Sequence, residues 1–270
     1  MNARSALFDL FGDHLRGRRG QAPVAVVVRL LGALDIAPPA VRTAVSRMVR
    51  QGWLEPVRLP SGPGYALTAM ATRRLDEAAA RIYRTRSEPW DGRWHLLVVD
   101  SSADRGVRDR LRSGLSFLGY APLAETTWLG AQESSEVDTL LSADGVRAHR
   151  FRSELDGDPK ALAATAWDLD GLARSYRRWL DDAYQIVAPA AGDPTDEQAF
   201  AARSRLVHEW RKFLFTDPGL PRDLLPASWP GDRAASFFDE EAGRLLAASQ
   251  RFVADCLHAS QQPSANGAHR

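Results

Sequence analysis

The chain has 270 residues, a length that allows two or three domains. Of these residues 44% are hydrophobic and 26% are charged, which are ordinary values for a globular protein. It contains no run of about 18 apolar residues, which excludes a membrane-spanning helix. The first residues lack a long apolar stretch, so we expect no signal peptide and a cytoplasmic location. The single cysteine, Cys256, cannot form an internal disulfide or a cysteine metal knuckle, and we expect it to pack as a small apolar residue on a C-terminal helix.

Charge is unevenly distributed along the chain. Residues 1–90 hold 14 arginines and no lysine against 7 acidic residues, a net charge of +7, and the remainder carries −6. A basic first part and a mildly acidic remainder fit a DNA-binding module joined to modules with other functions. The alternative interpretation is that these arginines only solvate helix surfaces.

The first 35 residues predict two helices. Ser5 can cap a helix that continues to Leu15, and a basic loop follows at Gly17–Gly20. Pro23 suits the start of a second helix, because apolar residues recur after it at the spacing of one helix face.

After a turn at Asp35–Pro39, the segment Pro38–Gln51 predicts a helix with two distinct faces. At about 100° per residue, one face is apolar and consists of Val41, Ala44, Val45, Met48 and Val49. Guanidinium and hydroxyl groups, which suit phosphate oxygens and guanine edges, share the other face: Arg42, Thr43, Ser46, Arg47 and Arg50. We interpret this segment as a DNA-recognition helix; an ordinary amphipathic helix, or one used for protein contact, is the alternative.

A hairpin is predicted directly after this helix. Gly52 ends the helix, Trp53–Leu59 and Tyr65–Thr68 read as strands, and residues 60–64 form the loop between them. Two helices followed by a hairpin give a winged helix-turn-helix. We expect Arg42, Thr43, Ser46 and Arg47 to touch base edges, and expect phosphate contacts from Arg50, Arg58, Arg18 and Arg19. A helix over Ala69–Arg86 and a boundary at Ser87–Pro89 follow.

The middle of the chain predicts strand, helix, two strands, helix, strand, which is the ferredoxin-like order. Such a domain presents one open sheet face, suited to dimer contact or ligand packing. The expected elements are Trp94–Asp100, Arg105–Leu118, Ala121–Leu123, Thr126–Leu129, Glu136–Ser142 and Val146–Arg152.

The last part is helical by its periodicity. We expect helices at Ala161–Ala188, with an interruption near Asp168, at Thr195–Phe215 and at Asp232–His258, with a loop at Pro218–Pro230. The fold class is therefore α+β, with domains at 1–88, 89–157 and 158–260 and a disordered tail at 261–270.

Motifs for catalysis are largely absent. The sequence has no Walker loop, GxGxxG or HExxH, and its six histidines show no metal-ligand spacing, so we expect neither an enzyme nor a metal site. Asp100 ends the first strand of the middle domain, where some nucleases of this fold keep a metal-binding carboxylate. We interpret Asp100 as a helix or turn cap, and a metal-dependent nuclease remains an alternative.

The segment Arg203–Leu214 places arginines on an apolar helix face, where a guanidinium needs an anion. That anion is either an acid of the chain, such as Asp168, Asp170 or Asp217, or a phosphate or carboxylate of a small ligand. Tryptophans 167, 179, 210 and 229 could line the neighbouring pocket, although tryptophans at helical spacing more often belong to the core. The candidate effector-binding residues are Arg203, His208, Trp210, Arg211, Lys212 and Trp167.

Several of these stretches resemble the PaaX family of repressors of phenylacetate catabolism. The similar stretches are Leu10–Leu15 (LFGDHL), Val41–Leu54, Tyr65–Thr68, Trp94–Asp100, Trp167–Asp170, His208–Phe213, Asp217–Pro221 and Leu224–Gly231. The resemblance implies a winged helix, a ferredoxin-like middle and a helical PaaX-type C-terminal domain. It also implies a homodimer on palindromic DNA that an aryl-CoA thioester such as phenylacetyl-CoA releases. A DNA-binding regulator without small-molecule input is the alternative.

Overall fold

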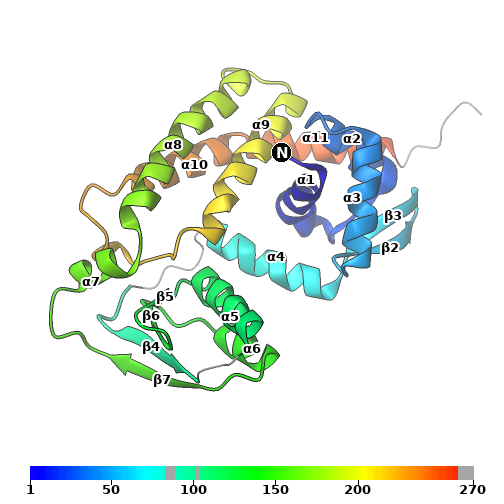
Figure 1. Cartoon of the computed structure of the whole chain (residues 1–270). Helices are drawn as coiled ribbons and strands as arrows, with labels where there is room; N and C mark the ends of the chain where they lie inside the picture. Colours follow the sequence, from blue (N-terminus) through cyan, green and yellow to red (C-terminus); the bar gives the residue numbers. More distant parts are fainter. Residues whose placement is uncertain (83–88, 101–103, 261–270) are drawn as a thin grey trace, which may run out of the picture. The chain divides into compact units, whose positions relative to one another are not determined.

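The computed structural model describes residues 1–82, 89–100 and 104–260. This part of the chain mixes helices with two antiparallel sheets and divides into two compact units (Figure 1). One unit contains the described residues of 1–85, 179–211 and 234–270, and the other contains those of 86–178 and 212–233. None of the helices in the described ranges is both long and apolar enough to cross a membrane.

The first unit begins with a helix whose geometry changes along its length. The α-helix α1 (Ala3–Asp9) continues as a π-helical segment η1 (Leu10–Leu15) and ends in the short 3-10 turn η2 (Arg16–Arg18). The predicted cap, Ser5, is wrong: Asn2 caps α1, and its side chain accepts a hydrogen bond of 2.9 Å from the backbone N–H of Ser5. Asparagine is among the strongest N-cap residues, and here it stands three residues ahead of the N–H that it satisfies.

Helices α2 (Val24–Gly32) and α3 (Pro38–Arg50) follow, as the sequence predicts. Two prolines open α3, where their missing N–H groups cost no helical hydrogen bond. The inner face of α3 is buried as expected and consists of Val41, Ala44, Val45 and Met48, with Val49 half-buried. Gly52, at a φ of +72°, directs the chain out of the helix.

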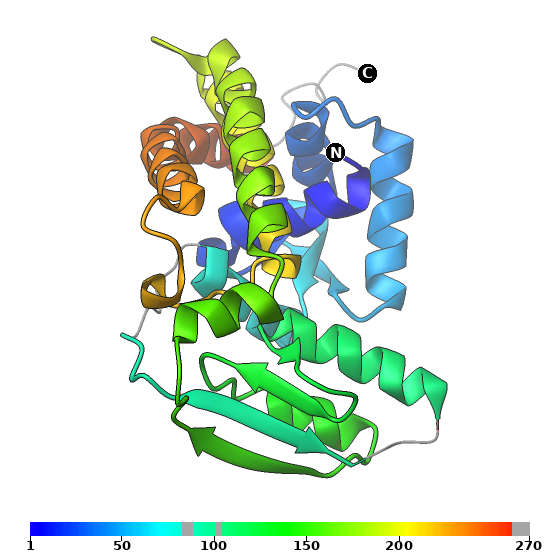
Figure 2. The same cartoon turned by 60° about the vertical axis from the view of Figure 1, so that its left-hand side comes forward.

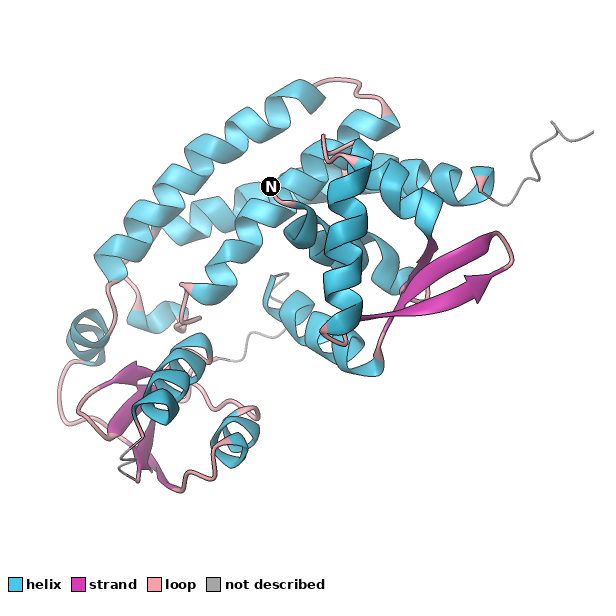
Figure 3. Cartoon of the chain, turned by 45° about the vertical axis from the view of Figure 1, so that its right-hand side comes forward, coloured by secondary structure: helices cyan, strands magenta, loops and turns pink. Residues whose placement is uncertain are grey.

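A three-stranded sheet completes the N-terminal part of the unit. Strands β2 (Leu54–Leu59) and β3 (Gly62–Leu67) form a hairpin beside α3 (Figure 3). The predicted five-residue loop at 60–64 is wrong, because only residues 60 and 61 lie between the two strands. The sequence did not predict β1 (Gln21–Pro23), which pairs with β3 in the order β1-β3-β2. A Cβ at Gly64 would lie 2.7 Å from the carbonyl oxygen of Ala22, so only glycine lets β1 approach.

The sheet leads into α4 (Ala69–Ile82). The predicted continuation of this helix to residue 86, the boundary at 87–88 and the tail at 261–270 lie outside the described residues.

Helices from the C-terminal part of the chain complete the same unit. They comprise the end of α8 (Leu169–Val187), the turn η3 (Ala188–Ala190), α9 (Asp196–Trp210), most of α10 (Pro230–Arg244) and α11 (Leu246–Ala259). The single last helix predicted at Asp232–His258 is wrong, because the chain turns at Leu245, two residues after the poor helix former Gly243.

One hydrophobic core joins these helices to α1, α2 and α3. Phe200 of α9 and Phe252, Val253 and Cys256 of α11 pack with the buried leucines and valines of the N-terminal helices. The core therefore joins residues from ranges 1–88 and 158–260, which sequence patterns place in different domains. Cys256 packs on a C-terminal helix as predicted.

The second unit is built on a four-stranded antiparallel sheet in the order β5-β6-β4-β7 (Figure 2). Its elements follow the predicted sequence: β4 (Trp94–Val99), α5 (Arg105–Phe117), β5 (Ala121–Pro122), β6 (Thr127–Gly130), α6 (Val137–Ala143) and β7 (Ala148–Ser153). Leu97 and Val99 of β4 pack against Leu111 and Leu115 of α5 and Leu141 of α6, so these helices cover one face of the sheet.

The opposite face is partly covered by later segments. Trp94 and Leu129 pack with Ala163 of α7 (Pro159–Ala166) and with Leu224 of the short turn η5 (Arg222–Leu224). The predicted interruption near Asp168 is confirmed: α7 ends at Ala166, and the Asp168 side chain accepts a 2.8 Å hydrogen bond from the backbone N–H of Gly171 at the start of α8.

Candidate nucleic-acid interface

The outer face of α3 carries every polar residue that the sequence placed there. Arg42, Thr43, Ser46, Arg47 and Arg50 are all exposed, on the side opposite to the buried valines. Among the described residues, no carboxylate pairs with Arg42, Arg47 or Arg50. Three guanidinium groups on one face, without acidic partners there, can donate to phosphates or to guanine edges.

The two hydroxyls on this face differ in what they can offer. The Thr43 hydroxyl donates a 3.0 Å hydrogen bond to the carbonyl oxygen of Pro39, one turn earlier in α3. Its proton is engaged within the helix, whereas its oxygen can still accept a hydrogen bond from a base amine. Ser46 lies between Arg42 and Arg47 in the sequence and is exposed.

The other predicted contacts lie in the same unit. Arg58 is exposed on β2, opposite Pro63 of β3, near the turn of the hairpin. Arg18, the last residue of η2, and Arg19, which follows it, are both exposed. Arg19 has a left-handed φ of 65°, and Arg18 donates from Nη2 to the carbonyl oxygen of Gln250 in α11 at 3.3 Å. Arg18 therefore also links this loop to a C-terminal helix.

Two further arginines flank the end of α3, and sequence reasoning missed them. Arg4 of α1 donates from Nη2 to Oε1 of Gln51 at 3.0 Å, and Arg74 of α4 lies 5.6 Å from the ring centre of Trp53. Both are exposed. Neither contact could be predicted from local patterns, because each joins segments that are distant in the chain. In the sequence, each arginine is simply one basic residue within a predicted helix.

The predicted effector residue Arg203 lies inside the first unit and is 4% exposed. Its Nη2 pairs with Oδ1 of Asp13 in η1 at 2.7 Å, and its Nη1 donates to the carbonyl oxygen of Ala242. The acids expected from the sequence, at 168, 170 and 217, are therefore the wrong partners. Next to this pair, His14 Nε2 lies 3.0 Å from the Ser204 hydroxyl, and burial lowers the pKa of His14 below its ordinary value despite the nearby Asp13 carboxylate.

A second buried carboxylate links α1 to the end of α9. Asp9, 4% exposed at the end of α1, has Oδ2 2.7 Å from His208 Nδ1 and also pairs with Nε of Arg211. The motifs around LFGDHL and HEWRKF thus meet through ionic contacts. Two of the predicted effector residues, His208 and Arg211, therefore pair with Asp9 within the protein, and their role in binding a ligand stays a prediction.

The remaining effector candidates have separate surroundings. Trp210 is buried in the first unit, with its ring 4.7 Å from that of Trp179, and donates from Nε1 to the carbonyl oxygen of Ile82 at 3.1 Å. Trp167 and Lys212 belong to the second unit, where Trp167 stacks on Trp94 at 6.1 Å and Lys212 is exposed. The candidates therefore do not form one site within either unit.

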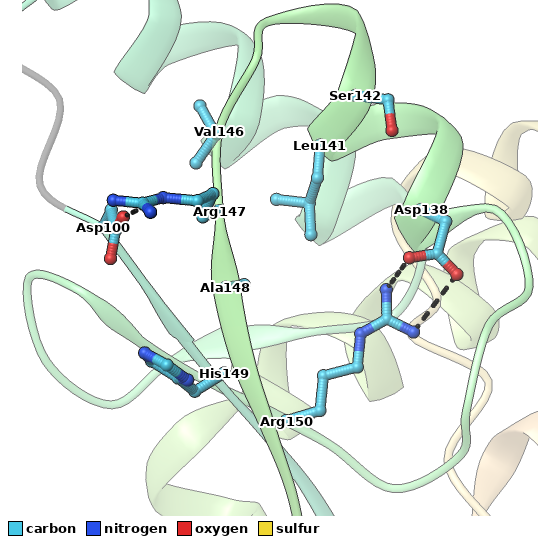
Figure 4. Close-up of a pocket in the computed structure, with 9 residues that line it drawn as sticks. All are labelled: Asp100, Asp138, Leu141, Ser142, Val146, Arg147, Ala148, His149 and Arg150. Carbon is cyan, nitrogen blue, oxygen red and sulfur yellow. Dashed lines mark hydrogen bonds and ion pairs between the residues drawn. The ribbon is translucent and has the colours of Figure 1, made fainter.

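A shallow hollow of about 420 Å³ lies between β7 and α6 in the second unit (Figure 4). Each of its two carboxylates forms an ion pair with an arginine: Asp100 pairs with Arg147 at 3.1 Å, and Asp138 pairs with Arg150. The helix-cap role predicted for Asp100 is wrong, because Asp104 caps α5 by accepting from the Val107 N–H at 3.0 Å. The turn-cap role predicted for Asp100 would involve residues 101–103, which lie outside the described residues. Within the described ranges, no three histidine, cysteine or acidic side chains are grouped to hold a metal ion.

Models of protein families match the chain in three consecutive segments. Residues 2–71 match the PaaX-like protein model, residues 87–163 match the PaaX protein central Cas2-like domain, and residues 167–255 match the PaaX-like protein C-terminal domain. The N-terminal match includes α3 and the hairpin, and the C-terminal match includes the α9 residues that pair with Asp9 and Asp13.

Whole proteins resemble the chain over the same range. It is 29% identical to "Transcriptional repressor PaaX" of Escherichia coli (strain K12), over 94% of this chain and 84% of that protein. It is also similar in structure to "Uncharacterized protein Rv0674 from Mycobacterium tuberculosis", with a TM-score of 0.61, 25% identity and coverage of 97% of this chain and 99% of that one. Because all three family segments occur in order and the similarity spans nearly the whole length, the chain belongs to the PaaX family.

Proposed function

We propose that this protein is a transcriptional repressor that binds double-stranded DNA through the outer face of α3. The observation that carries the proposal is the exposure of Arg42, Arg47 and Arg50 on one side of a helix whose other side is buried. In this proposal α2, α3 and the β2–β3 hairpin act as a winged helix-turn-helix, with α3 in the major groove. The repressor function named for the relative in Escherichia coli supports the same conclusion.

The proposed middle domain is ferredoxin-like. The order of its elements, strand-helix-strand-strand-helix-strand, and the sheet order β5-β6-β4-β7 support this assignment. We propose that the protein acts as a homodimer on palindromic DNA, since two recognition helices about 34 Å apart reach successive major grooves.

An aryl-CoA thioester is the proposed effector, on the strength of the family resemblance. A ligand that binds the free and the DNA-bound dimer equally well cannot release DNA. The effector must therefore favour a spacing or tilt of the two recognition helices that does not fit successive grooves.

DNA selection followed by gel-shift titration tests the proposed function. Duplexes that the protein selects from a randomised pool give an operator, and Arg47→Ala is expected to reduce the preference for that operator over random DNA by about 1–3 kcal/mol. Arg58→Ala, a loss at a phosphate, is expected to weaken binding to both DNAs alike. Equal losses on both DNAs for Arg47→Ala would defeat the base-contact assignment.

The effector is tested separately on the same operator complex. A panel of acyl-CoA thioesters is added to the complex and to the free protein, and DNA release and thermal unfolding are measured. A specific effector is expected to raise the unfolding temperature of the free protein and to release the DNA. A thioester that raises the unfolding temperature but leaves operator affinity unchanged would argue against induction by that compound.

A further inference from the structure

Two exposed arginines at the end of α3 are held by a pair of aromatic rings. The guanidinium carbon of Arg4 lies 5.5 Å from the ring centre of Phe8, and that of Arg74 lies 5.6 Å from the ring centre of Trp53. The Phe8 and Trp53 rings contact each other edge to face, with their centres 4.6 Å apart. These four side chains, from α1, the start of the hairpin and α4, form one cationic stack, which we term the arginine–aromatic stack.

Hydrogen bonds fix the arginine–aromatic stack to the end of the recognition helix. Arg4 donates to Gln51, which lies one helical turn after Arg47 and on the same flank of α3. Thr68, directly before α4, donates from its hydroxyl to the Gly52 carbonyl oxygen at 2.6 Å and from its N–H to the Trp53 carbonyl oxygen at 3.2 Å. These hydrogen bonds hold the start of α4 to the end of α3. Figure 1 shows these two helix ends near each other.

The two guanidinium groups of the arginine–aromatic stack are suited to binding an anion. Phe8 and Trp53 are half-buried, whereas Arg4 and Arg74 are exposed and have no carboxylate partner among the described residues. A guanidinium stacked on a ring keeps its N–H groups available at the edge, and it has already lost part of its rotamer freedom. A preordered cation beside a recognition helix is suited to a DNA phosphate, which fixes register without reading sequence.

We propose that Arg4 and Arg74 contact backbone phosphates beyond the C-terminal end of α3, and that the Phe8–Trp53 ring pair positions them for this. The inference rests on the proposed DNA binding and extends its surface from α3 and the hairpin to α1 and α4. The rival explanation is purely structural, since cations near a helix C-terminus also offset its partial negative charge.

The salt dependence of DNA binding separates these explanations. Binding to a mixed-sequence duplex of about 30 base pairs is measured by fluorescence anisotropy between about 50 and 200 mM salt for the full-length wild type, Arg4→Gln, Arg74→Gln and the double variant. Each lost phosphate contact is expected to reduce the slope of log affinity against log salt by about 0.9 per bound protomer, and to weaken binding about threefold to tenfold. Arg74→Lys keeps the charge and is expected to keep the slope.

Arg112→Gln provides the matched control, because Arg112 is exposed on α5 in the other unit and its loss changes the net charge equally. Its slope is expected to equal that of the wild type. If the Arg4 and Arg74 variants keep the wild-type slope and lose only thermal stability, the arginines are structural and the inference is wrong. If the wild type binds no duplex at all, the proposed function itself fails and the inference falls with it.

Discussion

Arg203 and Arg47 carry the same guanidinium group in opposite surroundings. Arg203 is 4% exposed and paired with Asp13, whereas Arg47 is exposed on α3. A buried guanidinium with a carboxylate at 2.7 Å is already neutralised by the protein, so a ligand anion would have to compete with Asp13. At the scale of single residues, burial and partners distinguish arginines that hold the fold together from those available to DNA.

The ion pair between Asp13 and Arg203 gives a prediction for stability. Asp13→Ala leaves the buried guanidinium without its carboxylate and is expected to lower the free energy of unfolding by about 3–5 kcal/mol. Asp76→Ala, which removes the partner of Arg16 in a pair that is 34% and 54% exposed, is expected to cost less than about 1 kcal/mol. Urea unfolding measures the free energy of unfolding of both variants. If both lose a similarly small amount, the buried pair stabilises the fold no more than the exposed pair does.

His14 gives a prediction for the effect of pH. Burial lowers the pKa of His14 below 6.5, while Asp13 and Asp9 raise it and Arg203 and Arg18 lower it. The unfolded chain therefore binds a proton at His14 at a higher pH than the folded chain does. This contribution to stability is fully present above pH 6.5 and is lost as the pH falls from there towards the lowered value.

Urea unfolding at about pH 7.5 and about pH 5.5 measures this loss. His14→Gln is expected to show a smaller loss than the wild type, because the substituted side chain does not titrate. The comparison with the variant is needed because the pKa of His95 in the second unit is also lowered by burial. Equal losses in wild type and variant would exclude His14 as a source of the pH dependence.

Among the helices and strands, those defined by local patterns were predictable from the sequence. The inner and outer faces of α3 follow from one amphipathic period, and the prolines at its start and Gly52 at its end fix its bounds. The elements of the central sheet were predicted in order, because each strand and helix has its own apolar pattern.

Elements defined by distant partners were not predictable in this way. Strand β1 has three residues and exists because it pairs with β3, more than 40 residues away. Asp13 could not be chosen as the partner of Arg203 from spacing, since 190 residues separate them and the chain offers 34 acids. The arginine–aromatic stack was missed for the same reason, because it joins three elements.

Gly64 tests the part of the fold that local patterns did not reveal. Gly64→Ala would bring a Cβ to 2.7 Å from the Ala22 carbonyl oxygen and is expected to lower the free energy of unfolding by about 1–3 kcal/mol. Gly17→Ala is the control, because no atom lies within 4 Å of the added Cβ. If thermal or urea unfolding shows equal stability for the two variants, the close approach of β1 and β3 at Gly64 is not a constraint on this fold.

At the scale of the whole molecule, the two ends of the chain share one core. Phe200, Phe252 and Val253 from the C-terminal helices are at most 8% exposed and pack with α1, α2 and α3. Asp9 and Asp13 add ionic contacts from α1 and η1 to α9. The proposed DNA-binding helices therefore depend on residues that follow the central sheet in sequence, and a change in the C-terminal helices can reach α3 through α1.

A fragment ending at residue 90 tests this dependence. It lacks the aromatic and aliphatic partners supplied by α9 and α11, so we expect it to unfold at a lower temperature and with less cooperativity than the full chain. The measurement is circular dichroism with heating, with the full chain as the reference. A fragment that unfolds cooperatively at the temperature of the full chain would show that the N-terminal part is an independent domain.

The central claim is that the outer face of α3 reads DNA, and a binding titration of one triple variant tests it most directly. The test variant loses three exposed guanidinium groups from α3 and is Arg42→Ala/Arg47→Ala/Arg50→Ala. The control variant loses three guanidinium groups from exposed positions of the second unit and is Arg112→Ala/Arg177→Ala/Arg178→Ala. We predict that the first variant loses at least about a hundredfold in affinity for the selected operator while remaining folded, and that the control binds as the wild type does. A folded α3 variant that binds the operator with wild-type affinity would contradict the account.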